Sequence, residues 1–316
     1  MKKILIYVST KSNLNLPTKL GGIESLNYNL FKFLKKNNFN AKLVRDLSLK
    51  DKNTIWDIVI SSNDASIFSI LIAKKKILWL HNLLQIEKAF RKKQIWSIIV
   101  NNINAVFVSK YLQSYTSFLY FFSSKIVIDN FLDTSFINLK KNYKRKSIYV
   151  WSTRRMNGLI DLISSWRDNI TLLENSELHI FGIEKKKLQL ELNDLNLSKY
   201  NIFIHGFVDK KILVKYYLSS SGIICLGYDE TFCLNAIEGN AAGLPILTFG
   251  HTNLKNIVVN KQNGFVVKNF KMLITKILYI NNLKFNSKIK LINSCYKYSR
   301  KFYPNKSFKK WKDLLQ

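Results

Sequence analysis

Short apolar runs rich in Val and Ile recur along the whole chain and alternate with stretches of helical period. Runs that are apolar throughout are typical of parallel strands buried on both faces. They read KILIYVS, AKLVRD, WDIVISSN, KKILWLHN, NAVFVSK and SKIVIDNF in the first half, and KSIYVWS, ELHIFG, NIFIHG, GIICLG, LPILTF and NGFVVKN in the second. Between the first two runs, one apolar stripe at helical spacing is predicted from Leu26, Leu30, Phe33 and Leu34. The sequence therefore predicts an α/β fold with doubly wound parallel sheets.

The alternation is interrupted by the polar, basic stretch KKNYKRKS at 140–147. A chain of 316 residues also exceeds one ordinary core. We therefore expect an N-terminal Rossmann-like lobe over 1–140, a linker over 141–147 and a C-terminal Rossmann-like lobe over 148–300. Residues 301–316 are expected to form a helix that could cross back to the first lobe. Because open α/β sheets bind ligands at the carboxyl ends of their strands, the active site is expected between the lobes.

The formal net charge is +30, from 50 basic and 20 acidic residues. Each Lys near an anionic membrane contributes about 1 kcal/mol of attraction, so this charge favours an anionic membrane surface or an anionic substrate. Codon drift in an AT-rich genome is an alternative explanation, because 43 of the basic residues are Lys. No recognisable nucleic-acid motif accompanies the charge, so nucleic acid is not an expected partner.

The lengths of the apolar runs and the spacing of the cysteines predict the cellular compartment. The first run is shorter than the apolar core of about seven to fifteen residues that an export signal needs. No stretch reaches the roughly 18 apolar residues of a membrane span. Cys225, Cys233 and Cys295 lack the spacing of zinc ligands or of a disulfide framework. We expect a cytoplasmic protein without a bound metal, which could associate peripherally with the inner face of the cytoplasmic membrane.

The stretch ETFCLNAIEGNAAGLP, residues 230–245, follows the predicted strand GIICLG. Its apolar period predicts a helix over 231–242, with Asp229, Glu230 and Thr231 as capping residues. A helix N-terminus after a strand and a tight turn presents free backbone amides to an anion. The amides of Thr231 to Leu234 are therefore a predicted phosphate site.

Glu230 and Glu238 would lie about 12 Å apart along such a helix. This separation exceeds the roughly 5 to 9.5 Å between the two carboxylates of a glycoside hydrolase. It suits a ligand with hydroxyl groups at both ends and a diphosphate in the middle: a sugar near Glu230 and a ribose near Glu238. The alternative is that Glu230 is only a helix-start carboxylate and Glu238 a solvated helix residue.

This stretch resembles the donor-site signature of the family 4 retaining glycosyltransferases, which have two Rossmann-like lobes facing across a cleft in the GT-B fold. The resemblance implies that Glu230 contacts the donor sugar and Glu238 the ribose. It also implies that the N-terminal lobe over 1–140 binds the acceptor and the C-terminal lobe over 148–300 binds the nucleotide sugar. The intervening amides, expected to bind the diphosphate, belong to Thr231, Phe232, Cys233 and Leu234. The likeness covers about residues 20–268 and is strongest from 205 to 245.

Two segments of the first half agree with this resemblance. KLGGIESLNYNL is similar to the family's glycine-rich loop, which implies that Gly21 and Gly22 approach the donor phosphates. WLHN places His81 where the family often has a histidine beside the transferred sugar. A lone histidine beside an apolar strand is more often a packed residue, but His81 is predicted at the carboxyl end of its strand.

Two other segments depart from the family pattern. Where an Arg and a Lys are expected, the chain reads YVWSTRRMNGLIDLI, with Arg154 as the first choice for the diphosphate, Arg155 as the second, and Asn157 in place of the second cation. The expected N-G-x-D reads Asn130-Phe131-Leu132-Asp133 and lacks its glycine.

Together these residues predict a metal-independent, retaining glycosyltransferase of the hexosyltransferase type. The donor would be a nucleotide-diphosphate sugar, used as co-substrate without a cofactor, and the acceptor a glycan or a lipid-linked sugar in envelope polysaccharide or lipopolysaccharide synthesis. His81, Glu230 and Arg154 are the predicted catalytic residues. A nucleotide-sugar epimerase or hydrolase on the same fold, or a catalytically silent basic binding protein, are the alternatives.

Overall fold

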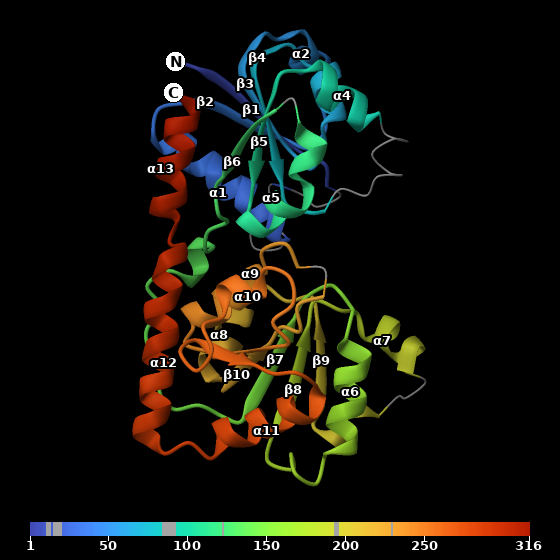
Figure 1. Ribbon diagram of the computed structural model, residues 1–316, viewed down its shortest axis with the longest axis vertical. Helices are drawn as coiled ribbons and strands as arrows, with labels where there is room; N and C mark the ends of the chain where they lie inside the picture. The colour runs from blue at the N-terminus through green and yellow to red at the C-terminus, as the bar shows by residue number, and fades with distance from the viewer. Residues whose placement is uncertain (11–13, 15–20, 84–92, 122, 193–195, 229) are drawn as a thin grey trace. The chain divides into compact units, whose positions relative to one another are not determined.

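The computed structural model describes residues 1–10, 14, 21–83, 93–121, 123–192, 196–228 and 230–316 (Figure 1). The chain divides into two compact units. The first comprises Met1–Asp133 and Phe302–Gln316, and the second comprises Thr134–Lys301. The stretch 141–147, which the sequence predicts as a linker, is thus part of the second unit.

The first unit is built on a parallel sheet with the strand order β2-β1-β3-β4-β5-β6. The strands are β1 (Lys3–Val8), β2 (Asn40–Val44), β3 (Trp56–Ser62), β4 (Ala73–Leu80), β5 (Ile103–Phe107) and β6 (Ser124–Val127). In the centre, Ile4 of β1 lies opposite Ile58 of β3, and Ile60 of β3 lies opposite Ile77 of β4. All four side chains are buried, as apolar runs covered on both faces require.

The helical elements of the first unit are α1 (Gly22–Lys36), α2 (Leu49–Asn53), η2 (Ser66–Ser69), α4 (Gln94–Val100), α5 (Lys110–Thr116) and η3 (Ser117–Tyr120). The connections from β4 to β5 and from β5 to β6 run in the direction opposite to that from β1 to β2. Right-handed crossovers therefore place α4 and α5 on one face of the sheet and α1 on the other, as Figure 1 shows.

The last helix, α13 (Pro304–Leu315), also belongs to the first unit. Its Trp311 ring meets the Trp79 ring of β4 edge-on, with 4.9 Å between centroids. Its Phe308 ring stacks on Phe33 of α1 at 4.2 Å. At its C-terminus, Lys2 Nζ donates to the Leu315 carbonyl oxygen at 3.0 Å, which complements the negative end of the helix dipole. The last residues thus complete the face of the sheet that α1 covers.

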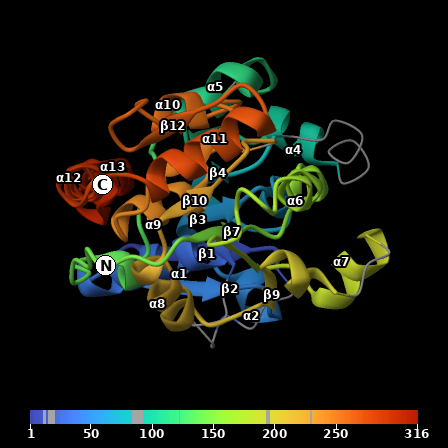
Figure 2. The same cartoon turned by 90° about the horizontal axis from the view of Figure 1, so that it is seen from below.

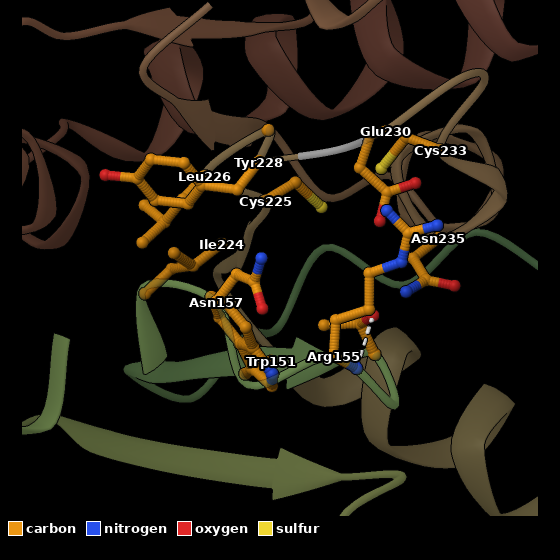
Figure 3. Close-up of a pocket in the computed structure, with 12 residues that line it drawn as sticks. Trp151, Arg155, Asn157, Ile224, Cys225, Leu226, Tyr228, Glu230, Cys233 and Asn235 are labelled. Atoms are coloured by element: carbon orange, nitrogen blue, oxygen red, sulfur yellow. Dashed lines mark hydrogen bonds between the residues drawn. The ribbon is translucent and has the colours of Figure 1, made fainter. Parts of the chain in front are cut away.

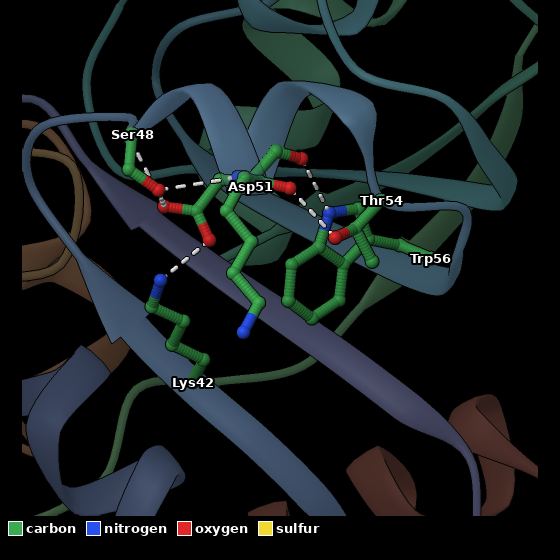
Figure 4. Close-up of polar contacts among 6 residues, drawn as sticks. Lys42, Ser48, Asp51, Thr54 and Trp56 are labelled. Carbon is green, nitrogen blue, oxygen red and sulfur yellow. Dashed lines mark hydrogen bonds and ion pairs between the residues drawn. The ribbon is translucent and has the colours of Figure 1, made fainter.

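Helix α2 is fixed between β2 and β3 by a capping box (Figure 4). Asp51 N–H donates to Ser48 Oγ at 3.2 Å, and Ser48 N–H donates to Asp51 Oδ2 at 3.1 Å. Lys42 of β2 donates to the other carboxylate oxygen, and Trp56 Nε1 donates to the Asp51 carbonyl at 3.0 Å. Burial opposes ionisation of Asp51, yet the hydrogen bonds from Lys42 and Ser48 hold its pKa below the ordinary value.

The second unit has the strand order β12-β11-β10-β7-β8-β9, again all parallel. The strands are β7 (Ile148–Ser152), β8 (Glu177–Phe181), β9 (Ile202–Gly206), β10 (Gly222–Ile224), β11 (Ile246–Thr248) and β12 (Gly264–Val266). Every apolar run quoted above forms a strand, so the predicted α/β architecture of two Rossmann-like lobes is confirmed.

The helices of the second unit cover both faces of its sheet. They are α6 (Leu159–Asp168), α7 (Lys185–Leu192), α8 (Lys210–Ser219), α9 (Leu234–Ala241), α10 (Leu254–Ile257), α11 (Phe270–Asn281) and α12 (Phe285–Ser299). Helices α6 and α11 pack on one face around a core that includes Trp166 and Ile277, and α8 and α9 cover the other face (Figure 2). Strand order reverses between β7 and β10, where the following helices diverge to opposite faces and leave a crevice.

Arg145 explains why 141–147 is not a free linker. Its guanidinium donates to the carbonyl oxygens of Tyr217 and Ala242, both at 2.8 Å, at the C-terminal ends of α8 and α9. Cationic groups are stabilising there because the helix dipole is negative at that end. Lys146 N–H also donates to the Ser219 carbonyl at 2.8 Å. The polar stretch is therefore bound to the ends of two helices.

Candidate active site

A pocket opens at the carboxyl ends of β7 and β10, where strand order reverses in the second unit (Figure 3). The space between its lining residues is about 340 Å³, which includes open solvent. The lining residues are Trp151, Thr153, Arg155, Asn157, Ile224, Cys225, Leu226, Gly227, Tyr228, Glu230, Cys233 and Asn235. Open α/β sheets bind ligands at this position.

The pocket combines one cation with one carboxylate among the residues that line it. Figure 3 shows the Arg155 guanidinium pointing toward the Glu230 carboxylate and the Asn235 side chain. The Asn235 amide also donates to the Ser152 carbonyl oxygen, which ties the first turn of α9 to the end of β7. The polar side chains of the pocket thus come from the loop after β7 and from the segment after β10.

Two helices begin at this edge of the sheet. Helix α6 starts after Gly158, where Leu159 N–H already donates to the Met156 carbonyl oxygen at 2.8 Å, and α9 starts after Cys233, whose side chain makes no cap hydrogen bond. The first amides of a helix have no intrahelical acceptor and carry a partial positive charge. Together with Arg155, they make the pocket suitable for an anion.

The helix after Glu230 begins three residues later than the sequence predicts. Helix α9 covers Leu234–Ala241, and its N-cap Cys233 has a left-handed φ of 67°. Thr231 and Phe232 lie before the helix, and both are buried. The helix therefore begins after the left-handed turn at Cys233, and the prediction that Glu230 and Thr231 cap it is wrong. Asp229, the third predicted cap, lies outside the described residues.

Glu238 lies in the second turn of α9 and is 9% exposed. The alternative of a solvated helix residue is therefore wrong. Burial, and next the negative charge of Glu238, raise the pKa of Tyr217 on α8 well above its ordinary value. The Tyr217 hydroxyl also forms a hydrogen bond with Ser152 at the end of β7. Glu238 thus lies close enough to Tyr217 of α8 to affect its ionisation, and it is not among the residues that line the pocket.

The two neighbouring arginines have different environments. The Arg154 guanidinium lies over the Phe207 ring, 5.2 Å from its centroid, in the loop after β9. Arg155 lines the pocket, and its backbone N–H donates to Thr153 Oγ1 at 3.3 Å. The geometry therefore brings the second choice of the sequence analysis, Arg155, together with Glu230.

Cys225 and Cys233 both line the pocket and are buried. A hydrogen bond with Cys225, and then burial, raise the pKa of the Cys233 thiol well above its ordinary value. Because thiolates are the reactive form of cysteine, Cys233 is not poised as a nucleophile at neutral pH.

His81, Gly21 and Gly22 belong to the first unit. His81 follows β4 directly, is 4% exposed, and has its Nε2 atom 3.5 Å from Ser62 Oγ. Gly21 is the N-cap of α1 with φ −68° and ψ 177°, a conformation open to any residue. The predicted roles of all three toward a donor stay predictions.

Burial lowers the pKa of His81 from 6.5 to about 3. The folded state therefore binds fewer protons than the unfolded state between these values, and stability falls as the pH drops below 6.5. From pH 7 to pH 5 this histidine should account for a loss of about 2 kcal/mol. We expect the His81→Gln variant to lose correspondingly less stability than wild type over this interval, measured by urea unfolding at both pH values. An identical loss in the two proteins would contradict the assignment.

A model of the family "Glycosyl transferases group 1" matches residues 131–302, more than half of the chain. The chain belongs to the group 1 glycosyltransferases. This result confirms the family resemblance seen in the sequence at the level of the group. None of the curated proteins has a sequence that matches the chain.

Solved glycosyltransferase structures share the fold at low identity. Sucrose-phosphate synthase from Thermosynechococcus elongatus superposes with a TM-score of 0.77 at 13% identity, covering 99% of this chain and 98% of that chain. Alr3699/HepE from Anabaena, in complex with UDP-glucose, has a TM-score of 0.72 at 11% identity, with coverages of 100% and 99%. WaaG, a glycosyltransferase involved in lipopolysaccharide biosynthesis, has a TM-score of 0.67 at 10% identity, with coverages of 94% and 95%.

Some residues of this glycosyltransferase pocket were not predicted as site residues. In the sequence, Asn157 stands out only as a departure from the family pattern, and no pattern points to Asn235 or Tyr228. Gly158 offers a signal in retrospect: its φ is 78°, and a Cβ there would lie 2.5 Å from the Tyr228 ring. The Asn-Gly pair thus lets the chain turn tightly beside Tyr228.

Two further findings concern the part of the chain that the structure describes. No group of three or more His, Cys, Asp or Glu side chains there is placed to hold a metal ion. No helix in these ranges is long and apolar enough to cross a membrane.

Proposed function

We propose that the chain transfers a sugar from a nucleotide-diphosphate donor to a glycan or lipid-linked acceptor, with retention at the anomeric carbon. The observation that carries this proposal is the pocket between β7 and β10. There Arg155, Glu230 and the N-termini of α6 and α9 lie at the reversal of strand order. Family membership supports the reaction class, and the anion-binding geometry supports the donor class.

Departure of the diphosphate is the step that the pocket would accelerate. Negative charge accumulates on the leaving oxygen while the sugar becomes cation-like. Preorganised donors aimed at that oxygen stabilise the transition state. In the proposal Arg155 and the first amides of α9 supply them, and this fixed positive charge makes a divalent metal unnecessary. The acceptor would attack from the face that the diphosphate leaves, since a raised thiol pKa makes Cys233 a poor covalent nucleophile.

The remaining predicted residues would position the donor. Glu230 would accept hydrogen bonds from the sugar hydroxyls, and Glu238 from the ribose. His81, neutral because its pKa is lowered, would act as a hydrogen-bonding group beside the sugar and not as an acid. Gly21 and Gly22, at the start of α1, would approach the phosphates.

We further propose that the acceptor belongs to envelope polysaccharide or lipopolysaccharide synthesis, at the inner face of the cytoplasmic membrane. The net charge of +30 supports an acceptor at an anionic surface. The shared fold of WaaG is compatible with this class of acceptor.

Nucleoside diphosphate binding tests the donor site. Titration calorimetry should detect binding of at least one nucleoside diphosphate to the wild type. In Glu238→Ala the affinity should fall by about tenfold or more, because hydrogen bonds to charged groups are worth about 1.5 to 3 kcal/mol. Glu191→Ala, at an exposed position of α7, is the control and should bind as the wild type does.

The results of the titration separate the alternatives. No binding of any nucleoside diphosphate would support the catalytically silent protein. Unchanged affinity in Glu238→Ala would contradict the ribose role. A donor screen with mass detection, run with and without acceptor, distinguishes a transferase from an epimerase or hydrolase, since those need no acceptor.

A further inference from the structure

Helix α4 of the first unit buries two polar side chains and Ile98, while three large apolar side chains face outward. Gln94 and Ser97 are buried at 6% and 1% exposure. Trp96, Ile99 and Val100 are 67%, 49% and 53% exposed. These three positions follow the i, i+3, i+4 spacing of one helix face. The helix therefore presents to solvent the stripe that a helix of a soluble protein normally buries.

Hydrogen bonds hold α4 in this orientation. Ser97 Oγ donates to the Ala65 carbonyl oxygen at 2.5 Å, and Gln94 Nε2 donates to Asp64 Oδ1 at 3.3 Å. At the end of the helix, Asn101 Nδ2 donates to Ser97 Oγ at 3.1 Å. Turning the apolar stripe inward would break these bonds and leave buried polar groups unpaired, at a large cost. The outward stripe is thus part of the folded structure.

Two more exposed apolar side chains adjoin the helix. Ile70 and Ile72 lie between η2 and β4 and are more than half exposed. Element η2 packs on α4, where Ser69 Oγ donates to Ser97 Oγ at 3.3 Å. Because β4 and β5 are parallel, the start of β4 and the end of α4, which leads into β5, lie at the same edge of the sheet. We name Ile70, Ile72, Trp96, Ile99 and Val100 the α4 apolar face.

The chain around this face is strongly basic. Residues 64–129 contain nine Lys or Arg and three acidic residues, Asp64, Glu87 and Asp129, of which Asp64 is bonded to Gln94 of α4. Figure 1 shows α4 on the side of the first sheet opposite α1 and α13, so neither of these two helices covers it. A Trp among aliphatic residues, in a segment with an excess of basic side chains, is a composition that favours the headgroup region of an anionic bilayer.

We propose that the α4 apolar face docks on an anionic lipid bilayer, with Trp96 at the level of the headgroups. A second copy of the chain fits this face less well than a bilayer does, because a two-fold contact through it would bring two basic segments together, and these would repel each other. Docking extends the proposed function, since a lipid-linked acceptor resides at a bilayer. Its test needs neither donor nor acceptor, so the two can fail separately.

Trp96 is a built-in reporter for this test. It is the exposed one of the six tryptophans, and the other five are buried. On addition of vesicles that contain phosphatidylglycerol, the emission should shift to the blue, and brominated lipids should quench it. Vesicles of phosphatidylcholine alone should bind about tenfold more weakly or less, because the electrostatic attraction is absent.

Substitutions on the α4 apolar face test whether its side chains contact the bilayer. Ile99→Ser retains the reporter, and Trp96→Ser is followed by co-sedimentation. Each should reduce partitioning about tenfold. Both side chains are exposed, so the core is left intact. Leu190→Ser, at an exposed apolar position of α7, is the matched control and should bind as the wild type does.

Three outcomes would overturn the proposal. The first is equal sedimentation of Trp96→Ser and wild type. The second is an unchanged Trp96 emission on addition of anionic vesicles. The third is a concentration-dependent dimer, seen by analytical ultracentrifugation without lipid, that Ile99→Ser abolishes.

Discussion

Arg155→Ala is expected to lower kcat for sugar transfer about 100-fold or more, since removal of one preorganised electrostatic donor costs about 100- to 1,000-fold in comparable sites. Arg155 is the cation among the residues that line the pocket, and it points toward Glu230 (Figure 3). Its positive charge would stabilise the negative charge that accumulates on the diphosphate as it leaves. The measurement is the steady-state rate with the donor identified by the screen.

Arg154→Ala is the matched control for this prediction. Arg154 has the same charge and is the adjacent residue, but its guanidinium lies over the Phe207 ring. We expect kcat to stay within about threefold of wild type, because loss of a solvent-accessible cation–π contact costs only about 0.5 to 1 kcal/mol. If Arg154→Ala is the inactive variant and Arg155→Ala the active one, the cation assignment is reversed and the first choice of the sequence analysis holds.

Glu230→Gln is expected to lower kcat/KM for transfer about 100-fold while it leaves nucleoside diphosphate affinity within about threefold of wild type. Glu230 would contact the sugar, which a nucleoside diphosphate lacks. The isosteric amide keeps the shape of the pocket, so packing is not disturbed. Calorimetry with the diphosphate and rates of transfer and donor hydrolysis together test the split.

Glu184→Gln serves as the control for the Glu230 variant, because this carboxylate is exposed just before α7 in the same unit. It should have the activity and affinity of the wild type. A Glu230→Gln protein that transfers sugar at nearly the wild-type rate would exclude the sugar contact. A variant that instead loses diphosphate affinity in parallel with activity would place Glu230 at the phosphates.

The strands were predictable because burial on both faces demands continuous apolar runs, which leave a direct mark in the sequence. The start of α9 was not. Phe232 continues the apolar period of the helix, but it is buried with Thr231 before the helix begins, and Cys233 turns the chain. Tertiary packing there outweighs the local pattern.

The choice between Arg154 and Arg155 was also beyond local reasoning. Two adjacent loop residues point in different directions, and the ring that receives Arg154 comes from Phe207, distant in sequence. Arg145 is a similar case. Its acceptors are backbone carbonyl oxygens at the ends of α8 and α9, and the sequence around Arg145 does not indicate these distant partners. The position of the candidate pocket at a strand end was predictable, but the contacts between segments that line it were not.

A crystal structure of the protein with a bound nucleoside diphosphate tests the central claim most directly. We predict that the diphosphate lies in the pocket between β7 and β10, with its oxygens on the first amides of α9 and on the Arg155 guanidinium. A diphosphate bound elsewhere, or one that contacts neither Arg155 nor the start of α9, would contradict the account.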